Sequence, residues 1–183
     1  MIDIKLVQES VGQYVQSWVG VHGLTHWARV LENGRLLAEL TGAKIEIVEL
    51  FAIFHDSKRV TEGLDFKHGP EGARYAEMLR STYLNFSDED FDLLYTACKY
   101  HTNGYTEGDI TVQTCWDADR LDLGRAFIIP NPQYLCTDAA KRPDIIKWAN
   151  KRSHERVVSD LILNEWGYDL NELIKEETYE KAL

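Results

Sequence analysis

Apolar residues recur at intervals of three and four along most of the chain, which is the spacing of amphipathic helices. Residues 3–19 show this spacing, and we expect one helix there. The next helix is predicted from about Thr25 to Leu40, with Thr25 as its N-cap and Gly42 as its stop. Gly34 costs this helix roughly 1 kcal/mol relative to alanine, and the sequence alone offers no reason for it.

The segment from Ala43 to Asp56 fits two interpretations at first. Its start alternates apolar and polar residues as in a strand, but the apolar run up to Phe54 does not alternate and is long for a strand. We interpret the segment as a helix that is buried on most sides. Such a helix places His55 and Asp56 at its C-terminal end, deep in the molecule.

The middle of the chain is also predicted to be helical. A helix is expected from His68 to about Tyr83. Another begins after Ser87, its N-cap, and runs to Tyr100 and His101. The segment 112–125 is predicted to form a further helix.

The C-terminal third begins with a region rich in proline. Three of the four prolines lie in 128–143, which predicts a long irregular connection. A closing helix is then expected, and its buried side is formed by Val157, Val158, Leu161, Ile162 and Trp166. The last residues either extend as a helix or fray. The chain is therefore predicted to be an all-α bundle, with residues 1–183 in a single domain and 143–183 as a C-terminal helical extension.

Composition narrows the functional classes. A length of 183 residues fits one domain with one core. No run approaches the roughly 18 apolar residues of a membrane helix, and the N-terminus lacks the pattern of a signal peptide. The three cysteines contain no CxxC and predict a reducing, cytoplasmic location. The net charge of −10 makes duplex nucleic acid a poor partner.

The adjacent pair His55-Asp56 is the sharpest chemical signal. It follows an apolar run that should be buried, and buried charged groups need partners or a metal ion. The alternative is a satisfied core histidine followed by an aspartate that caps the next turn. Asp117, which follows the apolar Cys115-Trp116, favours the metal. Together with His26 it would complete two imidazoles and two carboxylates, which suit a divalent cation.

The order His26…His55-Asp56…Asp117 resembles the H…HD…D signature of the HD-domain superfamily of metal-dependent phosphohydrolases. Supporting motifs are His26-Trp-Ala-Arg-Val, His68-Gly-Pro-Glu-Gly-Ala and Asp117-Ala-Asp-Arg-Leu-Asp. The resemblance covers about residues 20–126. It implies an all-helical HD-type fold with His26, His55, Asp56 and Asp117 as metal ligands. It also implies hydrolysis of a phosphate ester by a metal-activated water.

The resemblance leaves several roles open. His68 and His101 fall in the order in which dinuclear members bind a second metal, but they could instead contact substrate phosphate or water. Arg59 stands where cyclic-dinucleotide hydrolases have a lysine, and Lys58 is beside it. Either cation could serve catalysis by pairing a substrate anion, or both could simply stabilise a helix end. Asp122 could orient a ligand or act as an acid or base.

Other charged residues receive less weight. His22 is assigned either a structural role or a role in supporting a metal ligand, and His154 is expected at the surface. Asp119 and Arg120 are expected to form salt bridges. Arg125, Lys141 and Arg142 are interpreted as surface charge, with a phosphate pocket as the alternative.

The predicted function is hydrolysis of a small phosphorylated substrate, nucleotide-like or another phosphate ester. The cofactor would be one or two ions of Mn, Fe, Co, Ni or Zn. The chain lacks the Glu-Asp pair of stringent-response hydrolases and the Gly-Tyr-Pro signature of cyclic-di-GMP enzymes, so the substrate stays open. The alternatives are a di-iron oxygenase of the HD type, which needs His68 and His101 as ligands, and a non-catalytic regulator that binds nucleotides.

Overall fold

The computed structural model of the chain describes residues 2–180, and these form helices and loops without a β-strand. The helices are α1 (Ile4–Gly12), α2 (Leu24–Thr41), α3 (Ile45–Phe54), α4 (His68–Tyr83), α5 (Asp88–Tyr100), α6 (Ile110–Arg120), α7 (Pro143–His154), α8 (Leu161–Asn164) and α9 (Leu170–Glu180), with short 3₁₀ turns at Leu123–Ala126 and Pro132–Tyr134. The all-α prediction is confirmed. Within this part of the chain, no helix combines the length and the hydrophobicity needed to span a lipid bilayer.

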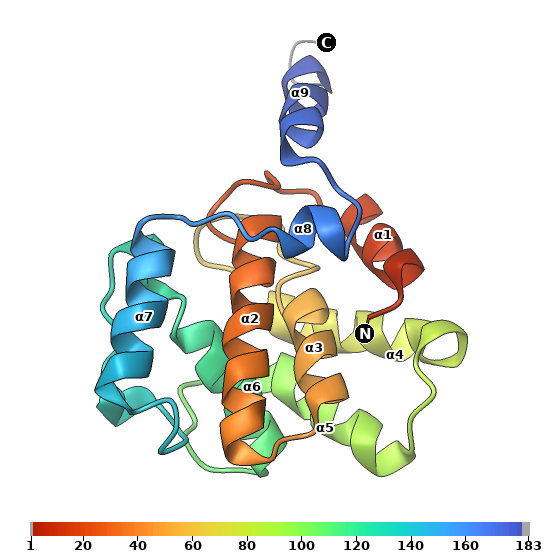
Figure 1. Cartoon of the computed structure of the whole chain (residues 1–183). Coiled ribbons are helices and arrows are strands. Elements are labelled where there is room, and N and C mark those ends of the chain that lie inside the picture. Colours follow the sequence, from red (N-terminus) through yellow and green to blue (C-terminus); the bar gives the residue numbers. More distant parts are fainter. Residues whose placement is uncertain (1, 181–183) are drawn as a thin grey trace.

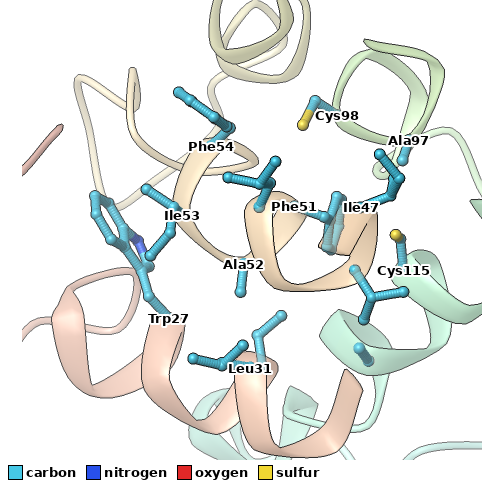
Figure 2. Packing of buried hydrophobic residues seen from close by; sticks show 14 of the residues in the cluster. Trp27, Leu31, Ile47, Phe51, Ala52, Ile53, Phe54, Ala97, Cys98 and Cys115 are labelled. Atoms are coloured by element: carbon cyan, nitrogen blue, oxygen red, sulfur yellow. The ribbon is translucent and has the colours of Figure 1, made fainter. Parts of the chain in front are cut away.

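Helices α2 and α3 lie side by side at the centre, and α6 and α5 pack against them (Figure 1). The apolar run predicted to be a buried helix is α3, and it is indeed covered on most sides. Figure 2 shows its side chains Phe51 and Ile53 among buried residues of α2, such as Trp27, and of α5 and α6. Burial of this run fixes the position of the His55-Asp56 pair that follows it.

Gly34 has a packing role that the sequence did not reveal. A Cβ atom at this position would lie 2.5 Å from the Cγ1 atom of Val48 on α3. Glycine at this position therefore leaves room for the Val48 side chain against α2, which offsets its cost to the helix.

Two predicted helix boundaries are confirmed and one is wrong. Gly42 ends α2 in a left-handed conformation, with a φ of 74°, and the Ser87 hydroxyl accepts a hydrogen bond from the amide of Asp90 at the start of α5. Thr25, however, is not the N-cap of α2, because Gly23 occupies that position. Thr25 therefore lies inside the first turn, which matters for the pocket described below.

The first predicted helix is too long. The helix α1 ends at Gly12, and residues 13–23 form a loop rather than a continuation to residue 19. The loop is stabilised by turns, including a hydrogen bond from the Gly20 amide to the Ser17 carbonyl, and by Glu177 of α9, which accepts hydrogen bonds from Ser17 and Trp18. These contacts from a distant segment compete with helical hydrogen bonding.

The prediction of a single closing helix is also wrong. A helix begins earlier, at Pro143, where proline is well suited to the first turn. It ends at His154, and Arg156 then adopts a left-handed φ of 51°, which stops the helix before Val157. The buried Leu161 and Ile162 belong to the separate short helix α8. The predicted helix 112–125 likewise divides into α6 and the 3₁₀ turn that follows Asp122.

Candidate metal centre

Five side chains from separate parts of the chain meet in the interior. They are His26 in the first turn of α2, His55 and Asp56 just after α3, His68 at the start of α4, and His101 just after α5. All five residues are at most 4% exposed. They therefore form a buried polar cluster on top of the apolar core.

Close packing of α4 against the end of α3 brings His68 to this cluster. A Cβ atom at Gly72 would lie 2.4 Å from the carbonyl oxygen of Phe54, so the helices touch through glycine. From below, the Phe51 ring stacks on His55, with 4.9 Å between ring centroids. The cluster thus has an apolar floor that excludes water.

Asp56 lies between two pairs of imidazoles. Its Oδ2 atom is 3.5 Å from Nε2 of His26 and 3.7 Å from Nε2 of His55. Its Oδ1 atom is 3.2 Å from Nε2 of His68 and 3.6 Å from Nε2 of His101. Each carboxylate oxygen therefore faces its own pair of ring nitrogens.

The other ring nitrogen of each histidine is held by an acceptor. Nδ1 of His26 lies 2.7 Å from the Asp122 carboxylate, and Nδ1 of His55 lies 3.1 Å from the Phe51 carbonyl. Nδ1 of His101 lies 2.8 Å from the Cys98 carbonyl, and Nδ1 of His68 contacts the carbonyl of Asp65. Because these oxygens only accept, each Nδ1 must carry the proton and donate.

This arrangement leaves lone pairs facing one another, which a metal ion would resolve. The Nε2 atoms of His26 and His55 are 3.0 Å apart, and so are those of His68 and His101. With Nδ1 protonated, neither nitrogen of a pair can donate to the other. Ligand atoms about 2.1 Å from one ion lie about 3.0 to 4.2 Å apart, and the distances within each group fall in this range. Both groups, His26-His55-Asp56 and Asp56-His68-His101, could therefore hold a metal ion.

The structure places Asp117 away from this role. Its Oδ1 accepts a hydrogen bond from the Cys136 amide at 2.7 Å, and its Oδ2 accepts from the amide and hydroxyl of Thr137, both at 2.8 Å. Both oxygens therefore anchor the loop that precedes α7. Asp119 approaches the cluster instead, with its Oδ1 3.4 Å from Nε2 of His26. The choice of Asp117 as ligand therefore needs correction, and Asp119 is the carboxylate in reach.

Helix geometry explains why Asp119, and not Asp117, faces the histidine cluster. Residues two apart on an α-helix differ by about 200° around its axis, so Asp117 and Asp119 leave α6 on opposite sides. A hydrogen bond of 3.0 Å from the Asn33 side chain to the Ala118 carbonyl fixes α6 against α2. This contact sets which aspartate faces His26.

Asp122 is the partner that orients His26. It is buried and accepts from His26 Nδ1 and also from Arg29, whose Nε and Nη2 lie 2.7 and 3.0 Å away. Arg125 lies 3.5 Å from Asp119 and 3.8 Å from Asp122. Burial alone would raise the pKa of Asp122, but His26 and the arginines lower it below its usual range, so Asp122 stays ionised. It therefore holds the imidazole in place, one of the two roles left open by the sequence.

Burial and charge give the histidines different proton affinities. Burial lowers the pKa of His55 to about 3 and also lowers that of His68. Burial also acts to lower the pKa of His101, but its interaction with Asp56 outweighs this and raises the pKa above the usual value. The imidazoles in turn hold the pKa of Asp56 well below its usual range despite burial. The carboxylate between the imidazoles is therefore ionised.

Comparison with solved structures identifies the fold. The chain is similar to the crystal structure of a predicted HD superfamily hydrolase from an uncultured Thermotogales bacterium, with 25% sequence identity, 89% of this chain and 90% of that chain covered, and a TM-score of 0.62. This chain has the HD-superfamily fold. No protein-family model matches the sequence, and no curated protein does. The expected HD-type architecture is thus confirmed by the structural comparison.

Within this HD fold, the two basic residues after the His-Asp pair have different positions. Arg59 is buried at the wall of the centre, with Nη1 3.1 Å from both ring nitrogens of His68 and 3.8 Å from Asp56 Oδ1. It also donates to the carbonyls of Thr61 and Gly63. Lys58 is directed elsewhere, because its Nζ lies 3.9 Å from the centroid of the Tyr75 ring. The structure therefore brings Arg59 to the centre but not Lys58.

The remaining histidines lie outside the cluster. The Nδ1 atom of His22 is 2.7 Å from the Glu62 carboxylate, and its ring lies 6.2 Å from that of His26. His154 is exposed at the end of α7.

The structure also brings Asp119 and Arg29 to the surroundings of the cluster, and neither was predicted from the sequence as a site residue. A signal for Asp119 existed, because it stands three residues before Asp122 and therefore shares its side of the helical segment.

Proposed function

We propose that this protein is a metal-dependent phosphohydrolase that acts on a nucleotide or another small phosphate ester. The observation that carries the proposal is the position of Asp56, whose two oxygens face separate pairs of imidazole nitrogens. In this proposal His26, His55, Asp56 and Asp119 hold one divalent ion, and Asp56, His68 and His101 hold a second. The similarity to a predicted HD superfamily hydrolase supports the same reaction class.

Residues around the centre fix the orientation of its ligands and limit the access of water. Bound divalent ions would lower the pKa of a coordinated water toward about 7 and offset the charge of a phosphoryl group. Asp122 keeps His26 protonated at Nδ1, so that Nε2 is free to act as a ligand. The Phe51 ring below His55 excludes water from beneath the centre.

The substrate is proposed to approach from the side of Asp119. The Asp119 side chain is 15% exposed, whereas those of the histidines and Asp56 are at most 3% exposed. Arg59, held against His68, is the proposed partner for a substrate phosphate oxygen, because guanidinium groups bind such oxygens strongly. To do so it must exchange a hydrogen bond to the 61–63 loop for one to the substrate.

The proposal is tested by metal reconstitution. Purified protein is stripped with a chelator, refilled separately with manganese, iron, cobalt, nickel or zinc, and assayed on nucleoside mono-, di- and cyclic phosphates and on a simple aryl phosphate. Release of phosphate or nucleoside that depends on the added metal is expected. If no metal supports cleavage of any of these compounds, the hydrolase assignment fails.

The second group of ligands also favours another function, a di-iron oxygenase. Such an enzyme needs two adjacent metal sites, and Asp56, His68 and His101 supply the additional one. Oxygen uptake by the iron-loaded protein in the presence of a polyol or a phosphonate would favour it. A content of one metal ion per chain in the fully loaded protein would exclude it.

A further inference from the structure

We propose that a small pocket at the start of α2 binds a phosphate group, at a site separate from the metal centre. The pocket has a volume of about 210 Å³ and lies between the loop around Gly20, the first turn of α2 and the turn after α7. Thr25, Arg29, Arg125 and Arg156 contribute its polar lining.

The first turn of α2 borders this pocket through Thr25 and carries backbone amides that the helix itself does not use. Gly23, the N-cap, provides no side-chain acceptor, and the amides of Leu24 and Thr25 have no hydrogen-bond partner among residues 2–180. The positive end of the dipole of an 18-residue helix lies here. Free amides and the dipole together favour an anion.

One buried side chain in the pocket wall, that of Arg125, has a nitrogen without a hydrogen-bond acceptor, which is independent support for a ligand. Thr25 also lines the pocket and is 8% exposed. Arg125 is 7% exposed, and its Nη1 atom has no hydrogen-bond partner. Buried polar groups usually have hydrogen-bond partners. A bound anion would provide the missing acceptor for Nη1 of Arg125 after a small movement of the guanidinium group.

The charge of the pocket also suits an anion. Arg29 is fixed by Asp122 and by the carbonyl of Val157, so it contributes its charge rather than free donors. Arg156 is exposed, makes no ion pair within residues 2–180, and has a left-handed backbone that is unfavourable for a side chain of its kind. The nearby carboxylates of Asp119 and Asp122 are already paired with arginines.

The size of the pocket limits the ligand to a phosphate group. Pockets for drug-sized molecules occupy roughly 300–1,000 Å³, so a whole nucleotide does not fit. Asp122 separates the pocket from the metal ligands, because it accepts from His26 on one side and from Arg29 on the other. Binding here therefore does not require a metal ion.

The test is a titration of the chelator-treated full-length protein with inorganic phosphate. Binding is followed by calorimetry and by the amide resonances of Leu24 and Thr25 in NMR spectra. We expect one phosphate per chain, shifts at both amides, and about tenfold weaker binding in Arg156→Gln, which loses a charge-assisted contact. Arg74→Gln, which removes an exposed arginine on α4, is the matched control and should bind normally.

A second variant tests the site without a change in net charge, because Arg156→Gln could weaken binding through the surface charge alone. Thr25→Val keeps the shape of the side chain and removes only its hydroxyl, so it should weaken phosphate binding several-fold while the fold is retained. A parallel titration with a nucleoside monophosphate distinguishes free phosphate from a phosphate group carried by a larger molecule. Absence of shifts at Leu24 and Thr25, or equal affinity of the wild type and Arg156→Gln, would overturn the proposal. Because no metal is present, neither result depends on the hydrolase assignment.

Discussion

Each half of the proposed metal centre contains its own pair of imidazoles, but the two halves differ in the groups that surround these rings. In the carboxylate half, His26 and His55 are accompanied by Asp119 and Asp122. In the carbonyl half, His68 and His101 are held by the backbone carbonyls of Asp65 and Cys98. Both halves share Asp56, and both have ring nitrogens 3.0 Å apart. Similar geometry is therefore combined with different electrostatics.

The difference in charge predicts a difference in affinity. Arg29 and Arg125 offset the charge of the two aspartates in the carboxylate half. The carbonyl half has no second carboxylate contact among the described residues, and the Arg59 cation lies 3.8 Å from its Asp56 oxygen. A divalent ion is attracted more strongly where an additional anionic ligand is in reach. We therefore expect the carboxylate half to bind its ion more tightly, and the carbonyl half to exchange it more readily.

The largest effect is expected from Asp56→Asn, because this residue serves both halves. The amide leaves a single oxygen and removes the shared negative charge, so both ions should be lost and hydrolysis should fall at least about a thousandfold. Elemental analysis of the dialysed protein, together with phosphate release, measures both effects. Retention of two ions per chain by this variant would refute the shared role.

The next largest effect separates the halves. His101→Ala removes a ligand from the carbonyl half alone, so the protein should keep one ion per chain and lose the other. Metal titration should show the tight site unchanged and the weak site absent, with hydrolysis reduced about a hundredfold or more if both ions take part. Circular dichroism checks that the fold survives loss of a buried side chain. Loss of the tight ion instead would reverse the assigned order of affinities.

A smaller effect compares the two aspartates of α6. Asp119→Asn should weaken the tight site about ten- to a hundredfold with little change in stability. Asp117→Asn should leave metal binding intact but lower the free energy of unfolding by about 2–3 kcal/mol, because buried donors of Cys136 and Thr137 lose acceptors. Metal titration and urea denaturation of both variants provide the measurement. The opposite pattern would restore Asp117 as the ligand.

The smallest effect is a difference in pH dependence. His55, with a pKa lowered to about 3 by burial, stays unprotonated in mildly acidic solution, whereas His101, whose pKa is raised by Asp56 against the effect of burial, gains its proton at a higher pH. An ion must displace that proton from His101 but meets none on His55. Acidification from pH 8 to 6 should therefore weaken the carbonyl half first. NMR titration of the imidazole resonances in the metal-free protein checks the order, which is contradicted if His55 gains its proton before His101.

Much of the fold and most of the cluster could be predicted from the sequence. The apolar run before His55 required burial, and this placed the His-Asp pair deep in the molecule. His26, His68 and His101 followed from their order along the chain. Local context was sufficient for the His-Asp pair, whereas His68 and His101 depended on the resemblance to the HD superfamily, which left their role open.

The sequence could not decide between Asp117 and Asp119, because both stand in the same helix beside buried residues. The choice depends on the rotation of α6, which is fixed by a contact with Asn33 of α2. The break between α7 and α8 was missed for a similar reason. Helical spacing continues across Arg156, but the backbone leaves the helical conformation there, and Leu161 and Ile162 pack on the core from the separate helix α8.

The central claim is that Asp56 lies between two metal ions, and anomalous X-ray diffraction from crystals loaded with manganese tests it most directly. We predict two anomalous peaks, one beside each carboxylate oxygen of Asp56, with the stronger peak near His26 and His55 and none beside Asp117. A single peak, no peak at Asp56, or a peak coordinated by Asp117 would contradict the account.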